Sequence, residues 1–181
     1  MYLHFKRLMR QPRINKISST SPEKVHGKLV KYRMGDCLSI HCGNGMFMGA
    51  LISEKFNKYY DLTLIEFYKP TKPLLIDFIE GKVFGTRFGS WENLTYAVDK
   101  QMFECKYVDS NSDIEIIGSL NLISPVEKAG YSYLDTVKQL HDYYLEEIPV
   151  RLEKSKNAEK FPEIAFVSKH LINTKTLLNN D

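Results

Sequence analysis

The 181-residue chain has little cysteine, and the odd number of three, irregularly spaced, excludes the disulfide framework of small secreted domains. It also lacks the apolar run of roughly 18 residues that a membrane-spanning helix needs. The basic N-terminal segment MYLHFKRLMRQPRINK is not followed by the apolar core of about 7 to 15 residues that is typical of a secretory signal. These absences predict a cytoplasmic protein without a membrane partner.

Motifs of common active sites are missing as well. The glycines at 43, 45 and 49 are not followed by the lysine, hydroxyl residue and helix of a phosphate-binding loop. The five histidines are scattered without the spacing of paired metal ligands. Neither Ser90 nor Ser132 lies in a nucleophile-elbow motif. The sequence therefore predicts no enzyme, no cofactor and no metal site.

The formal net charge of +3 is unevenly distributed, because residues 1–27 hold six Lys or Arg and one Glu. A basic arm can contact nucleic acid, but this one has few aromatic residues for base stacking and no known reading motif. Within it, SSTSPEKVHG has the composition of a linker. We interpret residues 1–27 as a basic arm and linker, and residues 28–181 as one domain with a β-rich core (28–122) and a helical C-terminal part (131–178).

Four successive segments have the pattern of strands, each short, rich in β-branched, aromatic or leucine residues and closed by Gly, Asn or Pro: KLVKYRM, DCLSIHC, GMFMGALISE and YYDLTLIEFYK. Tight connections between them predict an antiparallel meander. The last segment, residues 59–69, has apolar side chains on both faces and is expected to be buried on two sides. LLIDFIE (74–80) fits a short strand or one or two helical turns. Residues 101–108 and 114–120, joined by DSNSD, predict a second hairpin.

The strongest hairpin signal is Asn44-Gly45 between two apolar runs, because both residues tolerate the positive φ of a type I′ turn. This turn would pair Cys42 with Phe47, Ile40 with Gly49, and Leu38 with Leu51. We expect that face to lie in the core. The opposite face would carry Ser39, His41, Met48 and Ala50.

Cys37, His41 and Cys42 pose the question of a metal or nucleophile site within this hairpin. In a strand the two cysteines face opposite sides, whereas a disulfide or a zinc site needs sulfurs that converge. Cys37 and His41 would lie about 13 Å apart at the rise of a strand, beyond hydrogen-bond reach. The pattern therefore predicts a structural hairpin in which Cys42 is a small buried hydrophobic residue. An enzyme that uses Cys37 or Cys105 is the less favoured alternative.

The C-terminal third changes to helical spacing, with one face formed by Leu134, Val137, Leu140, His141, Tyr144 and Leu145. Ser132 is the expected N-cap, with Asp135 completing a capping-box-like pair, and Pro149 is expected to end the helix. FPEIAFVSKHLINTKTLL (161–178) fits a strand, a helix, or both. The predicted fold is α+β: a β-rich antiparallel, partly closed SH3-like barrel or curled sheet, with C-terminal helices packed on it.

Several short motifs resemble a known family. Gly35-Asp36 before an apolar strand, the Asn44-Gly45 turn, Phe47, Gly49 and the pair Leu51-Ile52 resemble the start of bacterial polymorphic-toxin immunity proteins of the immunity protein 26 family. IEIIGSLNL (114–122) resembles a strand in their second half, although Asp113 or Glu115 stands where a Trp is common. The resemblance covers roughly residues 28–150. It implies a protein that binds a toxin and blocks its active surface.

A stoichiometric inhibitor needs aromatic anchors and complementary charge rather than a catalytic group. The candidate anchors in or beside expected loops are Tyr59, Tyr60, Trp91, Tyr96, Tyr131 and Tyr133. Against a basic nuclease toxin, the candidate acidic contacts are Asp109, Asp113, Glu115, Glu146 and Glu147. The chain is expected to be a monomer or a homodimer, with a cognate toxin as its partner. The alternative is a small β-barrel regulatory module that contacts nucleic acid through the basic arm.

Overall fold

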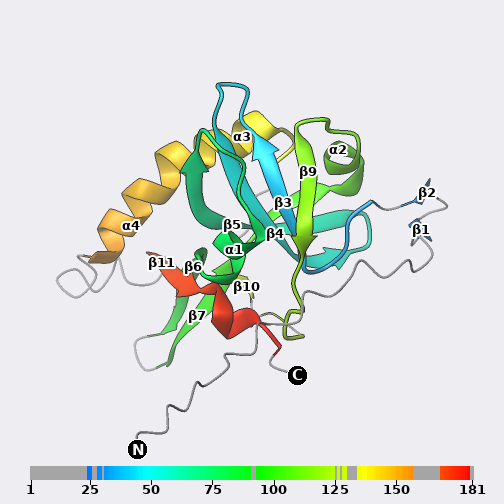
Figure 1. Cartoon of the computed structure of the whole chain (residues 1–181). Coiled ribbons are helices and arrows are strands. Elements are labelled where there is room, and N and C mark those ends of the chain that lie inside the picture. Colours follow the sequence, from blue (N-terminus) through cyan, green and yellow to red (C-terminus); the bar gives the residue numbers. More distant parts are fainter. Residues whose placement is uncertain are drawn as a thin grey trace, which may run out of the picture.

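The computed structural model describes residues 24–25, 28–29, 31–90, 93–124, 126, 128–129, 134–156 and 168–179 (Figure 1). Its main sheet has nine strands in the described residues: β3 (Asp36–His41), β4 (Phe47–Phe56), β5 (Tyr59–Lys69), β6 (Lys82–Ser90), β7 (Asn93–Asp99), β8 (Gln101–Glu104), β9 (Ile114–Ser119), β10 (Lys128–Ala129) and β11 (Ser168–Asn173). A separate two-stranded sheet pairs β1 (Lys24–Val25) with β2 (Lys28–Leu29). The helical elements are α1 (Leu75–Ile79), α2 (Cys105–Asp109), α3 (Val137–Asp142), the π-helical turn η1 (Tyr143–Glu147), α4 (Ile148–Lys156) and the 3₁₀ turn η3 (Thr174–Leu177).

The main sheet follows the order β10-β7-β6-β5-β4-β3-β9, with β8 paired to β5 and β11 paired to β6. All of these pairs are antiparallel except β10 with β7. The prediction of a β-rich antiparallel α+β fold is thus confirmed. The SH3-like barrel is wrong, because β9 and β10 end the sheet and do not pair with each other in the part of the chain that the structure describes.

The sheet is curled rather than flat because its strands bulge and branch. Strand β4 shifts register against β5 at two places, between Met48 and Ala50 and between Ile52 and Glu54. Bulges of this kind bend a strand and increase its twist. In addition, β5 pairs with β8 along its first residues and with β6 at Ile65. The sheet therefore branches at β5, whose first residues pair with β8 and whose later residues pair with β6.

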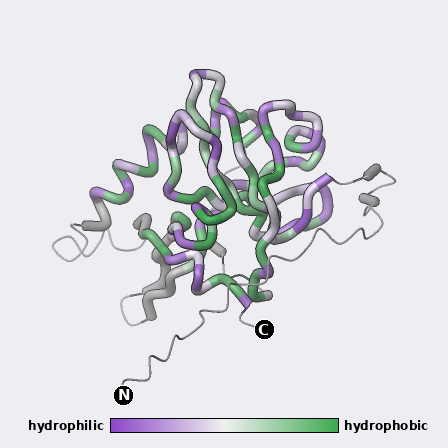
Figure 2. Tube along the Cα trace, viewed as in Figure 1, coloured by the Kyte–Doolittle hydropathy of each residue, from purple (hydrophilic) through white to green (hydrophobic). Residues whose placement is uncertain are grey.

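Both faces of the central strands are covered. On one face, Leu38, Ile40 and Leu64 pack with Leu140 and other residues of the C-terminal helices. On the other face lies a second cluster in which α1 and η3 cover the sheet: Cys37, Leu51, Ile65, Phe67, Phe78, Val83, Val98, Leu122, Val126 and Leu177. Figure 2 shows hydrophobic residues along the central strands, whereas hydrophobic and hydrophilic residues alternate along α4. The prediction that residues 59–69 are buried on two sides is confirmed.

A buried polar network fastens the C-terminal helical segment to the sheet. The hydroxyl of Tyr143 donates to Asp99 Oδ2 at 2.8 Å, and Gln101 Nε2 donates to the same oxygen at 3.1 Å. Burial, together with the neighbouring Asp99 carboxylate, raises the pKa of Tyr143, so this phenol stays protonated and remains a donor. Two donors from different elements thus converge on one buried oxygen, so the network fixes how the helix lies on the sheet.

The β3–β4 hairpin differs by one residue from the predicted register. Ile40 pairs with Met48 rather than with Gly49. The connection is a loop over residues 42–46 in which Gly43 and Gly45, not Asn44, have positive φ. Because side chains alternate along a strand, the shift places Met48, Ala50 and Ile52, rather than Phe47, Gly49 and Leu51, on the same face as Leu38 and Ile40. Leu51 is buried instead in the second cluster, on the opposite face of the sheet.

The predicted hairpin of residues 101–108 and 114–120 is wrong. Strand β8 ends at Glu104 and pairs with β5, while β9 pairs with β3. Between them α2 begins, where the Cys105 N–H donates to the Lys58 carbonyl at 2.7 Å. Cys105 and Val108 are both buried in the first core cluster. Their spacing of three residues is helical, a signal that the strand-like composition of the segment obscures.

The C-terminal helix begins at a different cap from the predicted one. Thr136 is the N-cap of α3: its Oγ1 accepts from the Gln139 N–H at 3.2 Å, and Gln139 Oε1 accepts in return from the Thr136 N–H at 3.3 Å. This reciprocal pair is a capping box. The predicted N-cap, Ser132, lies outside the described residues.

Pro149 does not end the helix, because it lies at the start of α4 directly after the π turn η1. In η1 the Ile148 N–H bonds to the carbonyl of Tyr143, five residues earlier, instead of the usual four. The regular helical hydrogen bonds are therefore already interrupted next to Pro149, which has no N–H to donate. The wider turn also changes which side chains face the sheet. Tyr143 is buried, whereas Leu145, predicted for the core face, is 43% exposed.

The two segments that the sequence left open are resolved. LLIDFIE contains α1, and residues 168–178 contain both the strand β11 and the turn η3. The first of the four strand-like segments is not part of the main sheet: Lys28–Leu29 pairs with β1 instead, although Tyr32 beyond it is buried.

Candidate partner-binding surface

The predicted hairpin is formed by β3 and β4, but Cys42, predicted to be a buried residue, is only partly buried. Cys37 is fully buried, and its thiol lies in the cluster on the α1 side of the sheet, whereas Cys42 packs on the side of the C-terminal helices. The two thiols therefore face apart. Within the part of the chain that the structure describes, no three His, Cys, Asp or Glu side chains come together as possible metal ligands.

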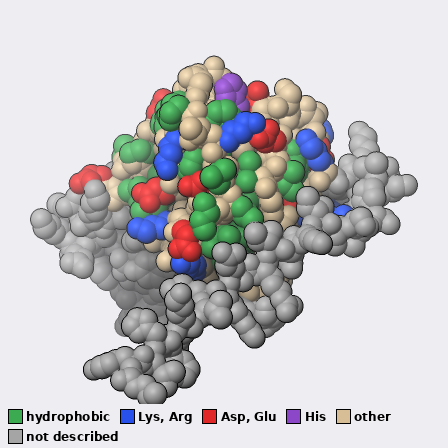
Figure 3. Space-filling view, viewed as in Figure 1, with side chains coloured by type: hydrophobic (Ala, Val, Ile, Leu, Met, Phe, Trp, Pro, Cys, Tyr) green, Lys and Arg blue, Asp and Glu red, His purple; other side chains and the backbone are tan. Residues whose placement is uncertain are grey.

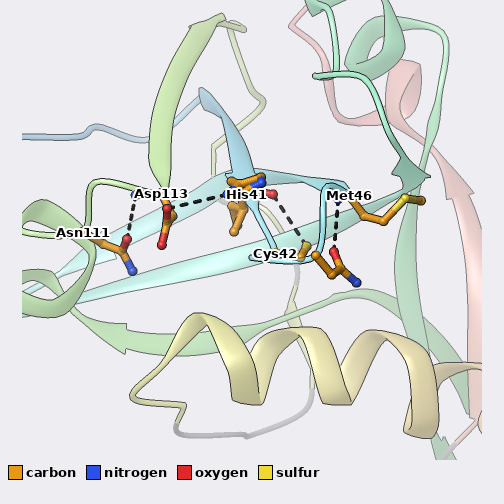
Figure 4. A network of polar contacts seen from close by, with 7 residues as sticks. His41, Cys42, Met46, Asn111 and Asp113 are labelled. Atoms are coloured by element: carbon orange, nitrogen blue, oxygen red, sulfur yellow. Dashed lines mark hydrogen bonds and ion pairs between the residues drawn. The ribbon is translucent and has the colours of Figure 1, made fainter.

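The end of β3 is held by a network of backbone and side-chain contacts (Figure 4). The His41 N–H donates to the Asp113 carbonyl at 2.8 Å, and the Asp113 N–H donates to Asn111 Oδ1 at 2.8 Å. The Cys42 N–H closes the loop onto the Met46 carbonyl at 2.9 Å. Figure 4 shows His41 and Asp113 adjacent, with Cys42 on the other side of the strand end. These contacts fix β9 to β3 and give the loop its shape.

The thiols are expected to be unreactive in the folded protein. Burial raises the pKa of Cys37 and of Cys105, and it raises that of Cys42 to about 11. A raised pKa leaves the thiol protonated at neutral pH, and the thiolate is the nucleophile. We expect iodoacetamide at pH 8 to modify the three cysteines slowly in the native protein and rapidly in urea, as followed by mass spectrometry. Rapid native labelling of one cysteine with loss of function would instead support the alternative of a cysteine enzyme.

The predicted contact residues are scattered over the molecule. Tyr60 is buried, and its hydroxyl donates to Asp109 Oδ1 at 2.8 Å. The ring of Tyr60 therefore belongs to the core and is not available as a surface anchor. Burial raises the pKa of the half-buried Asp109 carboxyl, although the hydrogen bond from Tyr60 opposes this effect. Trp91, Tyr131 and Tyr133 lie outside the described residues, and of Tyr96 only the place in β7 is described.

Tyr59 lies at the tip of the β4–β5 hairpin, where it pairs with Phe56 across the turn and with Glu104 of β8. Phe56 is 60% exposed. Glu104 bridges the ammonium groups of Lys58, at 2.9 Å, and Lys106, at 2.7 Å. The tip of the hairpin therefore presents the exposed ring of Phe56 beside a glutamate that already pairs with two lysines.

Glu146 and Glu147 lie on η1, in the helical layer on the far side of the sheet from α1, and both are exposed. Glu147 forms an ion pair with Arg151 at 2.9 Å, one helical turn away. Surface pairs of this kind contribute little to stability. Leu145 and Val150 are also exposed on this helical segment.

A third surface, which we term the α1 face, brings together apolar side chains from different parts of the chain. Leu74 and Ile76, at α1, are 64% and 52% exposed, and Ile123, after β9, is 38% exposed. Leu75 lies against Gly118 of β9, and the Ile123 N–H donates to the carbonyl of Leu177 in η3. Figure 3 shows hydrophobic side chains gathered at the centre of this side of the molecule, with charged side chains around them.

Ion pairs border the α1 face. Lys72 Nζ lies 2.7 Å from Glu115 Oε1. This ion pair connects the segment just before α1 with β9. Beyond α1, Glu80 pairs with Lys175 of η3. Asp113 precedes Glu115 by two residues, and its Oδ1 lies 3.7 Å from Nδ1 of His41 at the end of β3. The structure therefore places one predicted acidic contact, Glu115, at the border of an exposed apolar surface. Asp113 lies before the start of β9, beside His41.

Leu74 and Ile76 are absent from the sequence-based candidates, which favour tyrosines and acids. The signal is present in LLIDFIE, because a helix this short can bury only one side, here Phe78, while the segment carries apolar residues all around. Ile116 of β9 is also exposed, but its alternation with Glu115 places it on the other face of that edge strand.

No helix among the described residues is both long and apolar enough to cross a membrane. No family model, curated protein or solved structure matches the chain.

Proposed function

We propose that this protein is a cytoplasmic immunity protein, which binds a cognate bacterial toxin through the α1 face and neutralises it by non-covalent occlusion. The observation that carries the proposal is the exposure of Leu74 and Ile76 within a bordered apolar surface. Contiguous exposed apolar surface rimmed by polar residues is typical of protein interaction sites. The motifs of residues 35–52 and 114–122 that resemble immunity proteins support the same function.

The α1 face has the layout of an interface core with a polar rim. Covering Leu74 and Ile76 removes apolar area from water, which contributes favourable free energy to association. The helix that presents them is anchored, because Phe78 is fully buried between α1 and the sheet. A preformed, anchored surface needs little ordering on binding, which favours affinity.

The helical layer offers a less suitable surface. Val150 is as exposed as Ile76, at 53% against 52%, but it belongs to α4, where two charged residues adjoin it, Arg151 and Glu153. No element from another part of the chain is described as adding apolar residues beside it. This near-equal exposure makes Val150 a matched control for Ile76.

We expect Ile76→Asp to abolish protection from the toxin while leaving the fold intact. A charge at the centre of the apolar surface would have to be desolvated on binding, whereas an exposed substitution changes stability by about 0.5 kcal/mol or less. The test is co-expression of each variant with the toxin encoded beside this gene, followed by growth rate and by gel filtration of the complex. Thermal melting of the purified variants checks the fold.

Val150→Asp, the matched control, is expected to retain protection and complex formation. If the unsubstituted chain neither rescues growth nor forms a complex with the adjoining gene product, the proposed function is wrong. If Ile76→Asp rescues as well as the unsubstituted chain, the α1 face is not the binding site.

A further inference from the structure

The charges around the α1 face balance one another. The face is formed by α1 and the segment that leads into it, by β9 and the residues after it, and by η3, which together comprise residues 69–80, 114–124 and 174–179. The charged residues in these ranges are three lysines and three acids: Lys69, Lys72, Lys175, Asp77, Glu80 and Glu115. Figure 3 shows charged side chains of both signs around the hydrophobic centre. The residues that form the face therefore carry no excess of either charge.

Four of these charges are joined in ion pairs across the face. Lys72 pairs with Glu115, and Lys175 pairs with Glu80. The four side chains are about half exposed, so each pair contributes little to stability. Each pair nevertheless cancels a charge at the surface that an incoming partner would meet. A partner with a strong net charge of either sign would thus gain little electrostatic attraction here.

The other two charges are directed at the protein itself. Asp77 Oδ2 accepts from the Leu74 N–H at 2.7 Å, which places the carboxylate at the first turn of α1. Lys69 Nζ lies 4.9 Å from the centroid of the Phe67 ring, which is buried under the face. An ammonium group at this distance is attracted to the ring. All six charges thus have a partner inside the protein.

The apolar part of the face extends beyond the exposed Leu74, Ile76 and Ile123. Further apolar side chains of the same segments are only partly buried, where they pack against the second core cluster: Leu75, Ile117, Leu120 and Leu178. Removal of such surface from water is favourable without any partner of opposite charge. An aliphatic surface with balanced charges is therefore complementary to another apolar surface of low net charge.

We infer that the α1 face binds an uncharged apolar surface of the toxin, on which aliphatic or aromatic side chains cover Leu74 and Ile76. This inference rests on the proposed function and adds the chemistry of the surface that is bound. A basic toxin surface would find no net negative charge on the residues that form this face. Apolar burial then supplies the affinity, and the affinity changes little with salt, which screens only the charges.

The test uses the purified product of the adjoining toxin gene as the probe, with affinity measured by calorimetry at 50 and 300 mM NaCl. Two matched variants change the charge of the face in opposite directions and leave its apolar residues in place. Lys72→Gln/Lys175→Gln makes the face acidic, and Glu80→Gln/Glu115→Gln makes it basic. Each variant breaks the same two ion pairs, so an effect common to both is not an effect of net charge.

A third variant, Leu74→Asn/Ile76→Asn, removes the apolar centre without adding charge. Asparagine is also a favourable N-cap residue, which suits position 74 before α1. Val150→Asn, at similar exposure in the helical layer, is the control. The binding enthalpy is measured at several temperatures, because burial of apolar surface gives a negative change in heat capacity. Thermal melting shows whether each variant is folded.

We expect the dissociation constant of the unsubstituted chain to change by less than threefold between the two salt concentrations. Both charge variants should stay within threefold of it. Leu74→Asn/Ile76→Asn should weaken binding by at least thirtyfold at both salt concentrations and should make the change in heat capacity less negative. Val150→Asn should change affinity by less than twofold.

Tighter binding by one charge variant and weaker binding by the other would reveal a charged toxin surface, and would overturn the inference while leaving the proposed function standing. Full affinity of Leu74→Asn/Ile76→Asn would also overturn it, because the toxin would then not cover these side chains. Failure of the unsubstituted chain to form any complex would instead overturn the proposed function. A dimer of this chain alone that Leu74→Asn/Ile76→Asn dissociates would identify a second copy as the occupant of the α1 face and would overturn both.

Discussion

Replacing Ile40 with aspartate is expected to unfold the domain. Ile40 is fully buried in the cluster between the sheet and the C-terminal helices. The substitution removes an apolar side chain from this core and leaves a carboxylate there without a partner, at a cost of about 5 kcal/mol or more. Since domains of this size are stable by roughly 5–15 kcal/mol, the thermal transition of the variant should be lost or greatly lowered, and growth rescue should be lost with it.

His41→Ala is the control for Ile40→Asp, because the two residues are neighbours on β3 and differ in burial. The His41 side chain is 39% exposed, and we assign it no chemistry. Its loss should lower the free energy of unfolding by less than about 1 kcal/mol and should leave toxin neutralisation intact, as should Cys37→Ser. A folded but inactive His41→Ala protein would overturn the structural interpretation of the hairpin.

Gly35→Ala is the second substitution with a large expected effect. Gly35 has a φ of +91°, and a Cβ built on it would lie 2.2 Å from the carbonyl oxygen of Leu120. The residue also lies in the ladder, since its N–H donates to Ile52 and its carbonyl accepts from Leu120, each at 2.8 Å. Alanine therefore combines backbone strain with a collision that no side-chain rotation relieves. We expect a loss of roughly 3 kcal/mol or more in denaturant unfolding.

Gly45→Ala separates the two contributions. Gly45 has a similar φ of +78°, but a Cβ there would have no atom within 4 Å. Only the conformational preference is then lost, and we expect about 1 kcal/mol. Equal losses at the two glycines would show that the contact with Leu120 is relieved by movement of the backbone.

The sequence predicts the strands better than it predicts their partners. The pattern of residues 59–69 predicts a strand buried on both sides, because apolar residues occupy both the odd and the even positions and so lie on both faces of the strand. It does not fix the register of β3 against β4, because the glycines on either side of Asn44 allow a longer loop than the two-residue turn. The difference is one residue, yet it changes which side chains of β4 face the C-terminal helices and turns Leu51 to the α1 side of the sheet.

Long-range pairing explains the other differences. Nothing local in residues 101–120 indicates that β8 joins β5 while β9 crosses to β3, because these contacts depend on the completed sheet. The candidate surface shows the same limit. Glu115 could be proposed from its type, but its place at the border of the α1 face comes from the packing of α1 on β9 and from its ion pair with Lys72. Glu146 and Glu147, of the same type, lie in the opposite layer.

The position of α1 in the connection between β5 and β6 bears on how partner specificity can evolve. Phe78 alone among the residues of α1 is buried, so the outward residues Leu74 and Ile76 are under little constraint from the fold. Mutations there can accumulate without loss of stability, while the anchored helix keeps presenting whatever residues it carries. Lineages that face different partners could therefore diverge in the short segment 72–80 and retain one scaffold.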